Sequence, residues 1–188
     1  MRADDTMIPA WVDGMLRPMP KLETHERGLR HKAISVFVLR GDAVLLQRRA
    51  ACKYHTPNLW ANTCCTHPHW NEPSARCATR RLREELGITG LPLEARGTLE
   101  YRAEVGGGLI EHEVVNLFVG LAGPDLTVAP DPEEVRDHRW IGLDALAAEI
   151  AAEPSRFTPW LRIYMADHRD RIRPGGGKTA DPVTYGDG

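Results

Sequence analysis

The stretch that decides the fold is EPSARCATRRLREELGI, which runs from Glu72 to Ile88. Apolar side chains recur within it at helical spacing: Ala75, Ala78, Leu82 and Leu86. This periodicity predicts a helix that packs one face on a core. Pro73 suits the first turn of such a helix, and Gly87 suits the residue just past its end.

Strands are predicted on both sides of this helix from runs of β-branched and apolar residues. The expected strands are residues 33–39, 43–47, 98–103, 109–120 and 136–141, and the first four form two hairpins. Helices are expected at residues 143–152 and 158–172. This order predicts an α/β (α+β) fold, in which a mixed sheet lies between helices, with an N-terminal extension and C-terminal helices.

Size and composition limit the class of protein. The chain has 188 residues, of which 42% are hydrophobic and 27% charged, as in one globular domain. We expect residues 1–172 to form that domain and the Gly/Pro-rich residues 173–188 to be disordered. A net charge of −2 argues against a nucleic-acid partner. The sequence shows neither an apolar run of roughly 20 residues nor a signal peptide, so we expect a cytoplasmic protein that does not bind membranes. We also expect a monomer or weak dimer.

Two carboxylates lie within the apolar strand predicted at residues 109–120. Because side chains alternate in a strand, Glu111 and Glu113 share one face and His112 takes the other. Their neighbours on that face, Val115 and Leu117, indicate a buried face. Two buried carboxylates repel unless a cation or a proton lies between them. The alternative is a solvated edge face on which arginines pair with both carboxylates.

Three histidines complete a candidate metal site with these carboxylates. His25 and His31 precede the first long strand, and His67 lies in the segment before the central helix. Each of them alone is more typical of a surface or packing histidine. Together, three imidazoles and two carboxylates suit a five- or six-coordinate Mn, Fe or Zn ion better than Mg.

A pair of adjacent cysteines precedes His67. Cys52 and Cys77 do not supply the paired spacing of a zinc ribbon. Because a nearby metal or cation lowers the pKa of a thiol, Cys65 is a candidate nucleophile or acid–base group with a depressed pKa. The alternative, two small buried side chains, is stronger for Cys64 than for Cys65. A further set of cations suits a phosphate, although each alone is typical of a solvated surface charge: Lys21, Arg49, Lys53 and Arg81.

The central helix and its flanks resemble the Nudix box, whose pattern is G-x5-E-x7-R-E-U-x-E-E-x-G-U with U aliphatic. The matching residues are Glu72, Arg80, Leu82, Glu84, Glu85, Gly87 and Ile88. Thr66 stands where the pattern begins with Gly, and Arg81 stands where it has Glu. A box that keeps its spacing and loses a carboxylate indicates a Nudix fold put to another use.

The whole chain resembles the type I isopentenyl-diphosphate isomerases, a Nudix-fold family of isoprenoid synthesis. The resemblance covers roughly residues 10–170, and its segments are Lys21, His25, His31, 48–53, 59–68, the box helix, 101–103, 111–113 and 158–160. It implies interconversion of isopentenyl diphosphate and dimethylallyl diphosphate through a tertiary carbocation. Two other readings remain: a Nudix hydrolase, which would need the carboxylate that Arg81 replaces, and a non-catalytic ligand sensor.

The resemblance also implies a role for each candidate residue. Cys65 and Glu113 would be the acid–base pair, Tyr101 would assist the protonation, and the face of Trp160 would stabilise the cation. A Mn²⁺ or Zn²⁺ ion would bind His25, His31, His67, Glu111 and Glu113. Mg²⁺ would arrive with the substrate and bind Glu85 and the backbone carbonyl of Cys65. The diphosphate would bind Lys21, Arg49, Lys53 and Arg81.

Overall fold

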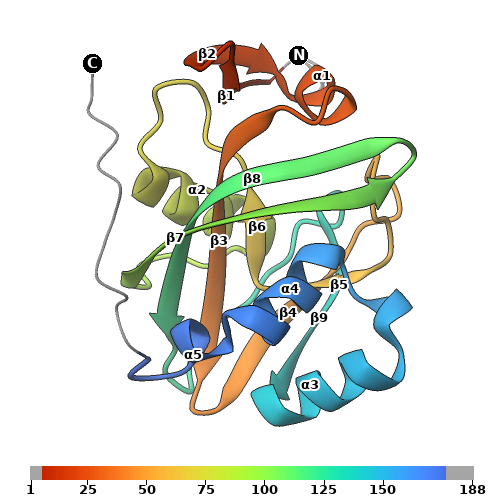
Figure 1. The fold of residues 1–188 in the computed structure, drawn as a ribbon. Coiled ribbons are helices and arrows are strands. Elements are labelled where there is room, and N and C mark those ends of the chain that lie inside the picture. Colours follow the sequence, from red (N-terminus) through yellow and green to blue (C-terminus); the bar gives the residue numbers. More distant parts are fainter. Residues whose placement is uncertain (1–5, 177–188) are drawn as a thin grey trace.

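The chain is built around a mixed β-sheet, which a computed structural model describes within residues 6–176 (Figure 1). The strands are β1 (Met7–Val12), β2 (Met15–Pro20), β3 (Arg30–Arg40), β4 (Ala43–Arg49), β5 (Trp60–Ala61), β6 (Cys64–Thr66), β7 (Leu93–Gly106), β8 (Leu109–Leu121) and β9 (Val135–Gly142). The helices are α1 (Lys21–Glu26), α2 (Ser74–Leu86), α3 (Leu143–Ala152), α4 (Pro159–Asp167) and α5 (Arg169–Ile172), with a 3-10 turn η2 (Pro154–Arg156). Among the described helices, none has the length and apolar character needed to cross a membrane.

Strand β3 holds the layers together, because its alternate side chains enter two different cores. It pairs in parallel with β8 and antiparallel with β1, β4 and β6. Ile34 and Val36 pack in the core that includes residues of α2, whereas Phe37 and Leu39 pack in the core that includes residues of α3 and α4. Figure 1 shows α2 and the C-terminal helices on opposite sides of the sheet. The predicted sheet between helices is therefore confirmed.

Helix α2 follows the sequence prediction at its ends and along most of its buried face. It begins directly after Pro73 and ends before Gly87, whose φ of 66° is the left-handed conformation that glycine adopts without strain. A Cβ at this position would lie 2.9 Å from the backbone oxygen of Ala129. The buried residues of α2 are Cys77, Ala78, Leu82, Glu85 and Leu86. Ala75 is exposed instead, because it lies in the first turn.

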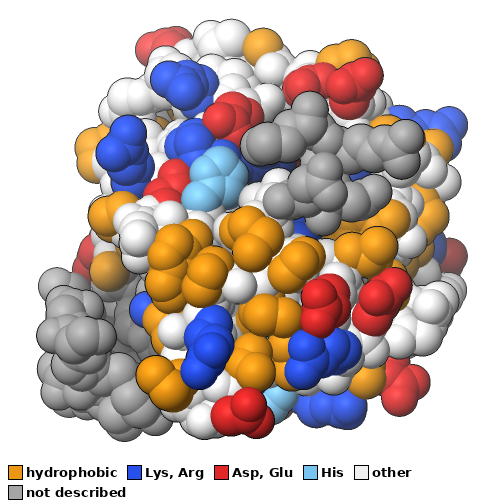
Figure 2. Space-filling view, turned by 90° about the horizontal axis from the view of Figure 1, so that it is seen from above, with side chains coloured by type: hydrophobic (Ala, Val, Ile, Leu, Met, Phe, Trp, Pro, Cys, Tyr) orange, Lys and Arg blue, Asp and Glu red, His pale blue; other side chains and the backbone are white. Residues whose placement is uncertain are grey.

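The N-terminal hairpin β1–β2 and helix α1 were not predicted as regular structure. Prolines at positions 9, 18 and 20 interrupt both strands, and proline is unusual in strands except at an edge. The hairpin lies at the edge of the sheet, in the order β2-β1-β3. Seen from this side, the surface carries many hydrophobic side chains beside a group of charged ones (Figure 2). The hairpin and α1 matter for function because they deliver Lys21 and His25.

The C-terminal region differs from the prediction in one respect. The single helix expected over residues 158–172 is wrong, because His168 adopts φ −130° and ψ 14° and separates α4 from α5. This break lets Ile172 return to the core, where it is fully buried. Residues 173–176 of the predicted tail are described, and the carbonyl of Gly176 accepts a hydrogen bond from the buried Arg96. The rest of that tail lies outside the described residues.

Candidate active site and metal centre

One cavity of about 510 Å³ collects most of the residues that the sequence predicted for the site. Those on its wall are Lys21, Arg49, Lys53, Cys65, His67, Arg81, Glu85, Glu111, Glu113 and Trp160. The other three, His25, His31 and Tyr101, are buried and contact residues of this wall. These residues come from segments spread over most of the chain, and the central sheet brings them together.

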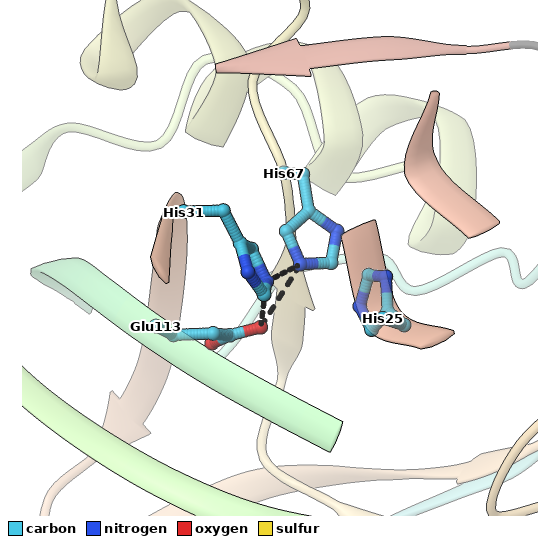
Figure 3. A group of neighbouring side chains, drawn as sticks. All are labelled: His25, His31, His67 and Glu113. Carbon is cyan, nitrogen blue, oxygen red and sulfur yellow. Dashed lines mark hydrogen bonds and ion pairs between the residues drawn. The ribbon is translucent and has the colours of Figure 1, made fainter. Parts of the chain in front are cut away.

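Three imidazoles and one carboxylate form a buried cluster (Figure 3), which we call the inner end of the cavity because two of its members, His67 and Glu113, line the cavity wall. His31 Nε2 lies 3.2 Å from His67 Nε2, and His67 Nε2 lies 2.9 Å from an oxygen of Glu113. His31 Nε2 is 3.7 Å from the same oxygen, and one ligand atom from each of His25, His31, His67 and Glu113 lies within 4.8 Å of the others. All four residues are buried.

The unpartnered atoms of this cluster fit a divalent cation. Nδ1 of His25 donates to a backbone carbonyl at 2.6 Å and Nδ1 of His31 does so at 2.7 Å, which turns both Nε2 atoms toward the cluster. Metal-bound histidines show this arrangement. Nε2 of His25 is buried without a hydrogen-bond partner. Burial, followed by the nearby His31, lowers the pKa of His25 to about 4, so its imidazole is neutral and has a free lone pair. The chain therefore has a divalent metal site.

Glu111 lies apart from this group of four, although it was predicted with them. Its ligand atom groups instead with those of His25 and His55, and its Oε1 lies 3.8 Å from His55 Nε2. Its other oxygen accepts a hydrogen bond from the Tyr101 hydroxyl at 3.2 Å, and the same hydroxyl donates to Glu113 at 2.7 Å. The solvated edge face is excluded, because Glu111 and Glu113 are only 3% and 1% exposed.

The two carboxylates differ in protonation. Burial raises the pKa of Glu111 well above its ordinary value, and the adjacent Glu113 charge adds to this. Burial also opposes ionisation of Glu113, but the neighbouring imidazoles of His31 and His67 outweigh it and hold the Glu113 pKa well below its usual range. Without a cation, these opposite shifts favour one proton shared by the pair, and Tyr101 bridges the two side chains.

Cys64 and Cys65 point to opposite sides of β6, as expected of neighbours in an extended strand. Cys65 lines the cavity, while Cys64 is fully buried in the core beneath α2, with its sulfur 3.5 Å from an oxygen of Glu85. The depressed pKa expected for Cys65 is not found. Burial, then the charges of Glu113 and Glu111, raise the pKa of this thiol well above its ordinary value. A cation bound by the carboxylates would oppose that rise.

The outer end of the cavity is cationic. Arg81 donates to an oxygen of Glu85 at 3.0 and 2.8 Å, and it lies 3.2 Å from Glu134. Lys53 also pairs with Glu134. Burial, followed by the charges of Lys53, Arg49 and Arg81, lowers the pKa of Lys21 to about 8. These cations outnumber their acidic partners, so this end suits an anion with several charges.

Trp160 lies beside Arg49 on the cavity wall. Trp160 is buried in the core and reaches the cavity wall, and the Arg49 guanidinium lies 5.3 Å from its ring centre. Arg49 also donates to the backbone oxygen of His55 at 3.2 Å. The indole therefore already accepts one cation–π contact, and its face is a candidate surface for a cationic intermediate.

Sequence reasoning missed several residues of the cavity, of which three bear on the site: Gln47, His55 and Glu134. Gln47 donates to Glu85 at 2.9 Å and to the backbone oxygen of Thr63 at 2.9 Å, so it positions the Glu85 carboxylate. None of the three belongs to a motif of fixed spacing. Their roles depend on contacts between distant segments, which leave no local signal in the sequence.

Two further box residues, Arg80 and Glu72, serve the structure. Arg80 donates to both oxygens of Glu72, at 2.6 and 2.7 Å, and its remaining nitrogen bonds Glu84 at 2.9 Å. This double hydrogen bond fixes the segment before α2 against the helix, and it holds the pKa of Glu72 at about 2. The box thus keeps its structural ion pair, while Arg81 changes the charge of the cavity.

Comparisons with known proteins agree with this geometry. The model of the NUDIX domain matches residues 29–161, which defines the class of the chain. Among solved structures, a Deinococcus radiodurans protein superposes with a TM-score of 0.67 at 14% identity, covering 85% of this chain and 96% of its own. A MutT NUDIX hydrolase from Burkholderia pseudomallei has a TM-score of 0.56 at 22% identity, covering 72% of this chain and 95% of its own. These likenesses show the fold.

Sequence relatives define the family more narrowly. An isopentenyl-diphosphate Delta-isomerase of Cereibacter sphaeroides is 68% identical over 166 residues, which cover 88% of this chain and 94% of that protein. The isopentenyl-diphosphate Delta-isomerase of Rhodobacter capsulatus is 61% identical over 170 residues, covering 90% and 97%. The chain belongs to the isopentenyl-diphosphate Delta-isomerase family.

Proposed function

We propose that this chain is an isomerase that interconverts isopentenyl diphosphate and dimethylallyl diphosphate. The observation that carries the proposal is the position of Cys65 in one cavity with Glu113, between an inner metal site and an outer group of cations. A small diphosphate ester has one highly charged end and one apolar end. The cavity matches this division, because its wall carries a group of cations as well as the acid–base groups.

The reaction adds a proton at the terminal alkene carbon and removes another from the carbon on the far side of the double bond. It therefore needs two acid–base groups that reach the same small molecule. We assign these roles to Cys65 and Glu113, with Tyr101 assisting the protonation through its hydrogen bond to Glu113 at 2.7 Å.

The tertiary carbocation between the two proton transfers needs an environment that stabilises it without trapping it. We assign this stabilisation to a cation–π contact with the face of Trp160. Such a contact contributes about 2 kcal/mol or more in a dry site. Trp160 is 1% exposed, so water has little access to the same face. Exclusion of water matters because water would react with the cation.

We propose Mn²⁺ or Zn²⁺ for the inner site, bound by His25, His31, His67, Glu111 and Glu113. Imidazole nitrogens favour these ions over Mg²⁺. When bound, the ion holds the carboxylates in place and balances their charge. We propose that Mg²⁺ enters with the substrate and is held by Glu85, the backbone carbonyl of Cys65 and the diphosphate.

The diphosphate would bind to the outer cations, Lys21, Arg49, Lys53 and Arg81. Arg81 occupies the position of a carboxylate in the Nudix box, so a metal ligand of the hydrolases has become an anion-binding group. We further propose that residues 1–172 act as one catalytic domain, in a cytoplasmic protein that is a monomer or weak dimer, and that it acts on a small molecule without a nucleic-acid or membrane partner.

The test is a product analysis. The purified protein, loaded with Mn²⁺ and supplied with Mg²⁺, is incubated with isopentenyl diphosphate, and the products are separated by chromatography. We expect dimethylallyl diphosphate and no free phosphate. Release of phosphate would instead support a Nudix hydrolase, and unchanged substrate would support a ligand sensor.

A further inference from the structure

His55 is a buried histidine to which the proposed reaction assigns no role. It is 6% exposed, lies in the segment between β4 and β5, and lines the cavity. Its Nε2 atom lies 3.8 Å from an oxygen of Glu111, which is too long for a hydrogen bond. Two ligands of one ion, each bonded at about 2.0–2.2 Å, can lie this far apart. The separation of His31 and Glu113 in the first cluster is almost the same, at 3.7 Å.

The ring of His55 is held in the same way as those of His25 and His31. Its Nδ1 lies 3.1 Å from the hydroxyl of Thr56, as the Nδ1 atoms of the other two lie close to backbone carbonyls. In each case the second nitrogen is left to face the buried carboxylates. Metal-bound histidines are typically oriented by such a hydrogen bond on the other ring nitrogen.

The backbone beside His55 adopts a conformation that its sequence does not favour. Thr56 has a φ of 46°, in the left-handed region that β-branched residues rarely adopt. Strain of this kind persists where the surrounding structure requires one particular geometry, and it is common at binding sites. Here the strained residue supplies the hydroxyl that orients the imidazole.

His25 connects the two groups of possible ligands. One ligand atom from each of His25, His55 and Glu111 lies within 4.8 Å of the others, as is the case for the group of His25, His31, His67 and Glu113. Because Nδ1 of His25 is bonded to a carbonyl, its Nε2 is the atom available to both groups. An ion bound to that atom would be shared by the two groups, each of which contributes one carboxylate.

We infer that His55 is a further ligand of the divalent cation, which it binds through Nε2 beside Glu111. The ion would then draw four imidazoles and two carboxylates from two groups that share His25, a set that suits six-coordinate Mn²⁺. The inference rests on the metal site of the proposed function, but it does not depend on which reaction the cavity performs. The competing role for His55 is packing, because its ring lies 6.0 Å from that of Trp160 in an edge-on arrangement.

Two measurements on His55→Ala distinguish a ligand from a packing residue, and neither requires turnover. The first is the dissociation constant for Mn²⁺, from the electron paramagnetic resonance signal of the free ion. The second is the imidazole scattering in the X-ray absorption spectrum of the Zn²⁺-loaded protein. His112→Ala is the matched control, because His112 lies on the opposite face of β8 and pairs with Glu100.

We expect His55→Ala to weaken Mn²⁺ binding by about 10- to 100-fold and to lower the imidazole count from four to three. His112→Ala should change neither. His55→Gln, which retains a side chain of similar length, serves if the alanine variant does not fold by circular dichroism. A wild-type spectrum with three imidazoles, or an unchanged Mn²⁺ affinity in a folded His55 variant, would overturn the inference. Absence of isomerase activity alone would count against the proposed reaction and not against this ligand.

Discussion

The inner end of the cavity lacks positive charge, whereas the outer end lacks negative charge. At the inner end, neutral imidazoles and buried carboxylates present lone pairs without enough donors, and Nε2 of His25 has no hydrogen-bond partner. At the outer end, Lys21, Arg49, Lys53 and Arg81 present more positive charge than their acidic neighbours balance. The inner end is completed by a cation and the outer end by an anion.

This difference bears on how one fold could serve the proposed reaction. In both ends the scaffold is the Nudix sheet with α2, but Arg81 stands where the Nudix box has a carboxylate. The ligands proposed for the inner ion lie on α1, β3 and β8 and directly after β6, outside the box, whereas Glu85 of the box is proposed to hold Mg²⁺. Cys65 lies on β6 between the two ends, where a substrate held by its diphosphate would present its alkene.

The strongest test of this difference between the two ends is to remove the thiol of Cys65. Cys65→Ala should lower kcat by at least about 10²–10⁴-fold, the usual contribution of an acid–base group. Cys64→Ala is the control, and it should retain most activity because its side chain lies in the core beneath α2. Steady-state kinetics give kcat, and calorimetric titration checks that substrate still binds. If Cys64→Ala were the inactive variant, the assignment of the catalytic thiol would be wrong.

The next prediction tests the outer end. Arg81→Glu should raise KM for isopentenyl diphosphate at least about tenfold, because loss of a charge-assisted contact costs about 1.5–3 kcal/mol. Arg83→Glu changes the same charge on an exposed position of α2 and should leave KM unaltered. Arg81→Gln removes the contact without adding repulsion toward Glu85 and Glu134, so it replaces Arg81→Glu in the test if that variant does not fold.

The alternative role for Arg81 is structural. In that case it only neutralises Glu85 and Glu134, and both variants would lower the melting temperature without a change in KM. Kinetics at saturating Mg²⁺ and a melting curve, measured on the same preparations, separate the two roles.

The fold and the outline of the site were predictable because their signals are local. Strand alternation placed Glu111 and Glu113 on one buried face, and helical spacing placed Gly87 at the end of α2. The hairpin β1–β2 was not predictable, because prolines hide its strand character. His55 was not predictable either, since only the folding of the segment between β4 and β5 brings it to Glu111. The raised pKa of Cys65 depends on burial among carboxylates, which neighbouring residues in the sequence do not reveal.

The smallest expected effect concerns the pH dependence of the outer end. The pKa of Lys21 is lowered from its ordinary 10.5 to about 8, first by burial and then by the charges of Lys53, Arg49 and Arg81. Its positive charge is therefore present below pH 8 and lost as the pH rises through that value. Because kcat/KM reports the protonation state of the free enzyme, its value at this pKa should be about half of that at lower pH, and it should fall further as the pH rises. Arg remains protonated throughout this range, so Lys21→Arg should remove the inflection, whereas Lys32→Arg on β3 should keep it. A profile for Lys21→Arg with the same inflection near pH 8 would mean that another group titrates there, and that the outer end does not depend on the charge of Lys21.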